Sequence, residues 1–201
     1  MEEILLLSQR REVLSNELSE FQPSHQKPIE LTDPFLTTAA LQKSLRRADA
    51  AYAHGAALAL LAIDPARLWR RLVVVACEDF GLSDLDLTAQ VIAAASDKNW
   101  RQKMGGDEFV MSYLVTRLLQ CPRDRRTDEA YMLAVSISRS NNPEAALQQL
   151  PASPGLAELL REAVKLVLRC EQVVPYRGIR AVIATECDVA IARMALSLIH
   201  I

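Results

Sequence analysis

The sequence predicts an all-α protein, a compact multi-helix domain preceded by an N-terminal helix and a linker. Three observations lead to this prediction. Half of the 201 residues are hydrophobic while only 5% are aromatic, the chain contains just 6 glycines, and its apolar residues recur at helical spacing. This composition favours helices over a turn-rich β protein, and the length suits one well-buried domain with a helical appendage.

The chain has five predicted parts. An amphipathic helix is followed by a linker with three prolines, a helical domain, further helices packed on that domain, and a short tail. We expect the tail, LSLIHI, to be non-native, because it matches a translated transposon end used in preparing sequencing libraries, and we expect the native chain to continue past Ala195. The parts span residues 1–21, 22–34, 35–140, 141–195 and 196–201.

The N-terminal helix carries apolar residues on one face at heptad-like steps, with Arg11 interrupting the seam. Such a face predicts burial against another helix. It could dock on the main body or pair with another copy of the chain, and the sequence leaves both possibilities open. The apolar residues are Ile4, Leu7, Leu14, Leu18 and Phe21.

Capping residues predict where the next helices begin. We expect Thr37 or Thr38 to cap a helix over residues 39–47, and Asp49 to cap the following helix, which continues through Leu61. Serine, threonine and aspartate are favoured at this position because their side chains accept hydrogen bonds from free amides of the first turn.

The third helix has clear signals at both ends. Asp64 followed by Pro65 is typical of the N-cap and first helical position, and Gly81 is expected to end the helix. Asp84 or Asp86 then opens a helix that reaches about residue 96.

Residues 97–106 are predicted to be a loop, leading into a helix over Asp107–Gln120 that Pro122 follows. Further helices are expected from Thr127 to about residue 140 and again beyond Gly155. The count of eight to ten short elements suits a compact helical domain.

One alternative is an α/β enzyme. The runs Leu72–Val75 and Ala181–Ala184 are rich in β-branched residues, and acidic residues follow each of them. Buried parallel strands with catalytic carboxylates at their ends have this pattern. Both runs are short, however, and neither leads into a glycine-rich phosphate loop.

A second enzymatic alternative comes from Gly105–Phe109, whose letters spell the GGDEF signature of diguanylate cyclases. In those enzymes the motif is a β-hairpin that admits GTP and binds the catalytic metal. Here the other metal- and nucleotide-binding segments are missing, and Val110, Leu114 and Leu118 follow at helical steps. We therefore expect two glycines that end a loop, with Asp107 and its neighbour in a first helical turn.

Two other segments carry a more coherent resemblance. Leu41, Lys43, Ser44, Arg46 and Asp49 form an L-x-K-S-x-R-x-x-D pattern. A D-P…R-R-L…A-x-E-D-x-G-L-x-D pattern follows, made of Asp64, Pro65, Arg70, Arg71, Leu72, Ala76, Glu78, Asp79, Gly81, Leu82 and Asp84.

These patterns resemble the replication-associated recombination protein A family of AAA+ ATPases, which includes the Werner-helicase-interacting proteins. The match covers roughly residues 36–140 and corresponds to the helical region after the ATPase core, which is related to clamp-loader collars. The resemblance implies a collar-like helical scaffold that supports self-assembly. Arg47 stands where the family usually has glycine, and the chain has no G-x-x-x-x-G-K-[ST] loop, so ATP hydrolysis is not expected.

Two basic helix faces are the candidate partner- or phosphate-binding sites. The first consists of Lys43, Arg46 and Arg47, and the second of Arg67, Arg70 and Arg71, each at i, i+3 and i+4 spacing. Side chains at this spacing share one face of a helix, where they could hold phosphates or an acidic partner.

The competing interpretation is that these cations form internal ion pairs with Asp49, Glu78 and Asp79 or are simply solvated. A carboxylate near a helix C-terminus opposes the dipole unless it is paired, which favours such a pair. Trp69 is expected in the core, while Trp100 between polar neighbours is the better candidate for an exposed contact.

The remaining composition argues against several kinds of site. The four cysteines and three histidines are too widely spaced for a zinc site, so no metal, cofactor or catalytic residue is predicted. The net charge of −2 gives no overall attraction to nucleic acid. The chain shows no transmembrane-length apolar stretch and no signal peptide, so we expect a cytoplasmic protein.

Together these observations predict a non-enzymatic helical module for protein association. The resemblance implies that it acts in DNA replication or repair, by self-assembly or by docking to a partner ATPase. The alternatives are an enzyme of one of the two kinds above, or a direct nucleic-acid binder that uses the two arginine faces.

Overall fold

The computed structural model describes residues 2–80 and 83–124, together with the single residues 136, 142 and 145. Contacts divide the chain into two units at Asp124, and nearly all described residues belong to the first. The helices predicted after Thr127, the tail, and the alternative strand at 181–184 lie outside the described residues. The predicted domain boundary at residue 140 therefore stays a prediction.

All regular structure in the described part of the chain is helical, which confirms the predicted all-α class. The elements are α1 (Glu2–Glu20), α2 (Pro34–Arg47), α3 (Ala50–Ile63), α4 (Pro65–Val75), the π-helical turn η1 (Ala76–Phe80), α5 (Leu85–Ala95), α6 (Lys98–Lys103) and α7 (Asp107–Gln120).

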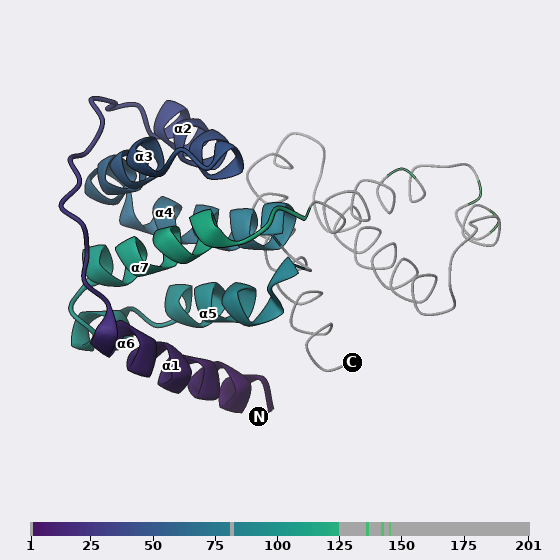
Figure 1. The fold of residues 1–201 in the computed structure, drawn as a ribbon. Helices are drawn as coiled ribbons and strands as arrows, with labels where there is room; N and C mark the ends of the chain where they lie inside the picture. The colour runs from purple at the N-terminus through teal and green to yellow at the C-terminus, as the bar shows by residue number, and fades with distance from the viewer. Residues whose placement is uncertain (1, 81–82, 125–135, 137–141, 143–144, 146–201) are drawn as a thin grey trace. The chain divides into compact units, whose positions relative to one another are not determined.

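The helices stack in layers around one apolar core (Figure 1). The α2–α3 hairpin lies at the top of that view, α4 and α7 lie below it, α5 follows, and α1 covers α5 from the other side. Leu60, Leu72 and Leu114, which come from α3, α4 and α7, are completely buried in the centre. Burial of such side chains is the main favourable term for folding.

The valine-rich segment is helical, so the strand alternative at Leu72–Val75 is wrong. As predicted, Asp64 caps the helix: its Oδ1 accepts a hydrogen bond from the Arg67 amide at 2.9 Å. That bond holds the pKa of Asp64 below its usual value. The chain stays helical through η1 to Phe80, directly before the predicted stop at Gly81.

The start of α2 differs from the prediction. Asp33 caps the helix with Pro34 in its first turn, so the helix begins inside the predicted linker. Thr37 and Thr38 are instead buried, and their hydroxyls donate to the carbonyls of Asp33 and Pro34. The start of α2 thus carries the same aspartate–proline signature as the start of α4.

Residues 97–106 also differ, because they contain the short helix α6 rather than a loop throughout. Asp97 accepts from the Trp100 amide and caps this helix. Gly105 and Gly106 then adopt φ of 103° and 96°, which glycine tolerates at little cost. The predicted helix over Asp107–Gln120 is confirmed, so the Gly105–Phe109 segment is not the hairpin of a cyclase.

The N-terminal helix docks on the body of its own chain. Leu14 and Leu18 are buried in the core, and α1 packs on α5. Arg11, which interrupts the apolar seam, donates to the Ala93 carbonyl and the Ser96 hydroxyl at the C-terminal end of α5. A cation is favoured at that end of a helix, which explains why the interruption is tolerated.

The linker is extended but closely packed where it crosses α3. The Ile29 amide donates to the Gly55 carbonyl at 3.1 Å. A Cβ atom on Gly55 would lie 2.9 Å from both Ile29 Cγ2 and the Lys27 carbonyl oxygen. Glycine is therefore required in the middle of α3, where it would otherwise weaken the helix.

We predict that Gly55→Ala destabilises the protein by about 2 kcal/mol, because the linker backbone must move away from α3. Helix propensity alone predicts the opposite sign, since alanine is the better helix former. Chemical denaturation measures the free energy of unfolding. A variant at least as stable as the wild type would contradict the packing described here.

A second prediction concerns His54, which is buried between α3 and α7 with Nε2 3.2 Å from the Thr116 hydroxyl. Burial lowers the pKa of this imidazole below its ordinary value of 6.5. The unfolded chain therefore binds more protons below pH 6.5, and stability falls as the pH drops through that value. In urea titrations between about pH 7.5 and 5.5, His54→Gln should lose less stability than the wild type. Equal losses would rule out this histidine as the cause.

Candidate partner-binding surface

Exposed apolar side chains gather on the α2–α3 hairpin. Among the described residues, five large hydrophobic side chains are exposed, and four of them belong to this hairpin. Phe35 is 70% exposed and Leu36 61%. The other two hairpin residues are Tyr52 and Ile63. An apolar concentration of this kind marks an interaction site more often than scattered single residues do.

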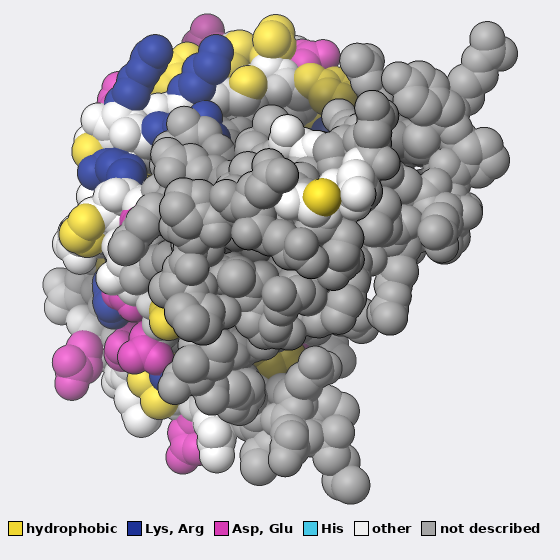
Figure 2. Space-filling model, turned by 90° about the vertical axis from the view of Figure 1, so that its right-hand side faces the viewer, with side chains coloured by type: hydrophobic (Ala, Val, Ile, Leu, Met, Phe, Trp, Pro, Cys, Tyr) yellow, Lys and Arg dark blue, Asp and Glu magenta, His cyan; other side chains and the backbone are white. Residues whose placement is uncertain are grey.

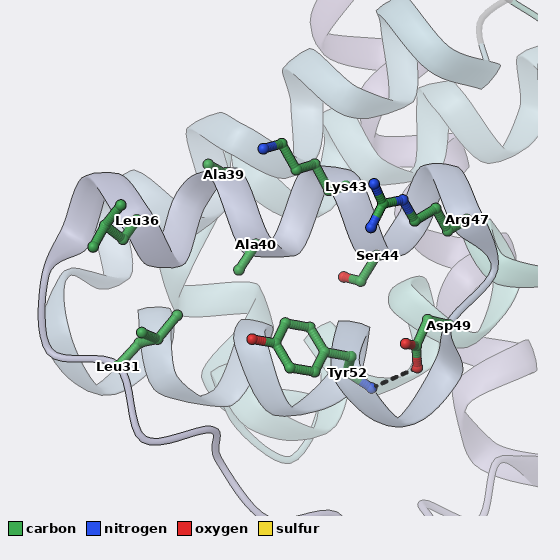
Figure 3. A pocket seen from close by; sticks show the side chains of 9 residues that line it. All are labelled: Leu31, Leu36, Ala39, Ala40, Lys43, Ser44, Arg47, Asp49 and Tyr52. Atoms are coloured by element: carbon green, nitrogen blue, oxygen red, sulfur yellow. Dashed lines mark hydrogen bonds between the residues drawn. The ribbon is translucent and has the colours of Figure 1, made fainter.

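Between α2 and α3 runs a groove of about 480 Å³, which we call the hairpin groove (Figure 3). Its apolar end is formed by Leu31 and Leu36, and its polar end by Arg47 and Asp49, while Lys43 lies midway along α2 with its side chain directed back toward Ala39. The remaining lining residues lie between these ends and are Ala39, Ala40, Ser44 and Tyr52. The small alanines leave the space that the groove occupies.

The two cations of the hairpin groove are exposed, and neither Lys43 nor Arg47 has a hydrogen bond or ion pair with a described residue. Figure 2 shows Lys and Arg side chains beside apolar ones at the top of that view, the level at which α2 and α3 lie in Figure 1. The predicted cationic face of α2 is therefore present, but with two of its three members.

The third member, Arg46, turns inward. Its Nε donates to Asp79 Oδ1 at 2.6 Å, and the Asp79 side chain is 0% exposed. Arg46 remains partly accessible, so the pair lies at the edge of the core. This ion pair joins α2 to η1. The guanidinium also offsets the unfavourable interaction between the Asp79 carboxylate and the negative end of the helix dipole.

Gln42 links the two predicted basic faces, a role that sequence reasoning missed. Its Nε2 lies 3.4 Å from Asp79 Oδ2, and its Oε1 accepts from Arg71 at 3.4 Å. Nearby, Arg123 donates to the Leu45 carbonyl at the end of α2. The spacing of Gln42, one turn before Arg46 on the same helix, was the available signal.

The second predicted face is divided in the same way. Arg67 pairs with Asp64 and lies over the Phe35 ring, 4.6 Å from its centroid. Arg71 is half-buried against Gln42, while Arg70 is exposed and forms no hydrogen bond or close ion pair with a described residue, although its charge helps to lower the pKa of Asp64. The arginines therefore serve partly as internal contacts and partly as free surface cations.

The remaining candidate residues cap helices or pack within the domain. Asp49 forms no ion pair with a described residue and instead caps α3 through the Tyr52 amide. Glu78 is half-buried in η1. Trp69 is buried, as predicted. Trp100 is not the exposed contact that was expected, because it packs against the core and its Nε1 donates to Ser15 at 3.3 Å.

A partly buried polar network around Glu17 was also missed. Glu17 Oε2 accepts from the Tyr113 hydroxyl at 2.7 Å and from Gln90 at 2.9 Å, which joins α1 to α7 and α5. Arg117 donates to the same hydroxyl. Burial, together with the hydrogen bond to Glu17, raises the pKa of Tyr113 to about 12. The network therefore helps to hold α1 against α5 and α7.

Within the described residues, no group of three or more His, Cys, Asp or Glu side chains is placed to hold a metal ion. None of the described helices has the length and apolar character needed to span a bilayer. The hairpin groove combines apolar lining residues with two exposed cations.

We predict that Arg46→Met costs about 2 kcal/mol of stability, because it leaves the buried Asp79 without its guanidinium. We expect this loss of stability to be smaller than for a fully buried ion pair, because Arg46 is partly exposed and solvent screens its charge. Lys43→Met, on the same helix, should change stability by less than about 0.5 kcal/mol. Thermal and urea unfolding of both variants measure the difference, and equal effects would show that the pair contributes nothing.

Comparison with protein-family models, with curated proteins and with solved structures yields no match to this chain.

Proposed function

We propose that this chain is a non-enzymatic protein-association module that binds its partner through the α2–α3 hairpin. The observation that carries the proposal is the placement of four of the five exposed large hydrophobic residues of the described chain on that one hairpin. Burying Phe35 and Leu36 against another protein would remove a large apolar area from water, which is the main driving force for association.

The cellular process in which the module acts is part of the same proposal. The collar-like patterns in α2 and α4 support a cytoplasmic role in DNA replication or repair, by self-assembly or by docking to a partner ATPase. The outward-facing position of Lys43, within one of those patterns, is compatible with a partner-binding role for that helix. No described residue is offered as catalytic.

Direct binding to nucleic acid has weaker support. Arg46, Arg67 and Arg71 are engaged by side chains of their own domain. The exposed cations that remain on these helices stand beside apolar residues that a phosphate backbone would leave in contact with water. Protein association uses both kinds of side chain.

Site-specific photo-crosslinking in the cells that make the protein tests this proposal. A crosslinking residue at Leu36 or Tyr52 should give discrete higher-mass products, because both side chains are exposed on the hairpin. The same residue at Ser19 or Gln102, exposed on α1 and α6, serves as the control.

Products that form from the hairpin positions and not from the control positions would support the proposal, and their mass would separate self-assembly from a different partner. Similar products from all four positions, or none from the hairpin, would contradict it.

A further inference from the structure

We propose that the hairpin groove binds an amphipathic helix of a partner protein, with apolar side chains at one end of that helix and carboxylates at the other. This inference rests on the proposed function and names the chemistry of the partner. It follows from three features of the groove: its polarity from end to end, its length, and the kind of backbone that surrounds it.

The apolar end defines half of the partner. Leu31 and Leu36 lie at the end of the groove where α2 begins, and Ala39 and Ala40 line the adjoining section (Figure 3). Leu36 is largely exposed, so an aliphatic or aromatic side chain inserted beside it would cover surface that is now in water. These four lining residues are all uncharged.

The section of the groove from Lys43 to Arg47 indicates the chemistry of the other half of the partner. Lys43 lies midway along the groove and Arg47 lies one helical turn further on, at the far end (Figure 3). Both are exposed, and neither has a hydrogen bond or ion pair with a described residue. Asp49 is the one carboxylate among the lining residues, and its Oδ1 accepts from the Tyr52 amide. Two cations against one anion that serves as a helix cap leave an excess of positive charge, which favours a partner carboxylate.

The surrounding backbone indicates that the partner is a helix. The two long walls of the groove are the α-helices α2 and α3, whose amides and carbonyls are bonded largely within the helices themselves, and Leu31 is the one lining residue that comes from the linker. The groove therefore presents side chains and no strand edge, so a bound segment must satisfy its own backbone groups. From Leu36 to Arg47 the wall rises by about 16 Å, which matches about three turns of a partner helix.

Two other occupants fit less well. A second copy would present another α2–α3 hairpin with the same two cations, rather than carboxylates, if the copies met through this surface. A nucleic-acid backbone would neutralise Lys43 and Arg47 but would leave Leu31 and Leu36 against a polar surface. An acidic amphipathic helix complements both ends of the groove.

The test is a selection from a displayed library of helix-forming peptides of about 12 residues, matched to the length of the groove. Wild-type protein is the bait. The expected binders carry apolar residues at i, i+3 or i+4 spacing in one half and Asp or Glu in the other half.

Selected peptides are then measured by fluorescence anisotropy against two charge-reversed variants. Lys43→Glu combined with Arg47→Glu should weaken binding about tenfold, since two exposed attractions become repulsions. Lys98→Glu combined with Lys103→Glu makes the same change in net charge on α6 and should leave binding unchanged. Circular dichroism confirms that each variant is folded.

A charge exchange completes the test. Peptides with Lys in place of their acidic residues should bind the Lys43→Glu, Arg47→Glu variant better than the wild type. Two results would overturn the acidic-helix inference: binders that lack acidic residues, or binders whose affinity is unchanged by the charge reversal at positions 43 and 47. If such binders still lose affinity on Leu36→Ser, the hairpin remains a binding surface. If no peptide binds, or if binding is insensitive to Leu36→Ser, the acidic-helix inference fails whatever the crosslinking shows. If hairpin crosslinks are missing as well, the proposed function fails with it.

Discussion

The carboxylate of Asp79 has no access to solvent, and its ion pair with Arg46 is the interaction on which the arrangement of the surface depends. An ionised carboxylate in that position would be costly without a close cation. Arg46 of α2 supplies this cation, and the ion pair joins the hairpin to η1. It also separates the cations of α2, since one turns inward and Lys43 and Arg47 remain on the outer side.

The same corner of the molecule gathers further contacts. The Asp124 amide donates to the Asp79 carbonyl, and Arg123 donates to the Leu45 carbonyl at the end of α2. The segment that follows α7 is thus bonded both to η1 and to the hairpin. These bonds tie the hairpin to the rest of the domain, and under the proposed function a preformed groove would lose little conformational entropy when a partner binds.

The GGDEF-like segment Gly105–Phe109 shows that the structural role of a short motif depends on the elements around it. The two glycines have positive φ, as a tight turn before a helix requires. Asp107 then pairs with the buried Arg101, whose guanidinium also donates to the Ala94 carbonyl at the end of α5. The acid that would bind a metal in a cyclase serves here to neutralise a buried cation.

The sequence by itself determined the helical class and several helix ends, because these depend on neighbours in the chain. Asp49, Asp64 and Asp84 cap helices where the local pattern predicted, and α7 has the predicted bounds. The start of α2 was locally encoded too, by Asp33 and Pro34, and was misassigned rather than hidden. Local hydrogen bonds within one turn suffice to specify such ends.

Only the tertiary structure decided which cations face outward, because that choice depends on residues more than thirty positions away. Arg46 and Lys43 look equivalent in the sequence, yet Arg46 forms an ion pair with Asp79 while Lys43 faces outward. The need for Gly55 comes from the crossing of the linker, and the half-burial of Trp100 comes from the docking of α1. Helical spacing fixes the face on which a side chain lies, while packing of distant segments decides what covers that face.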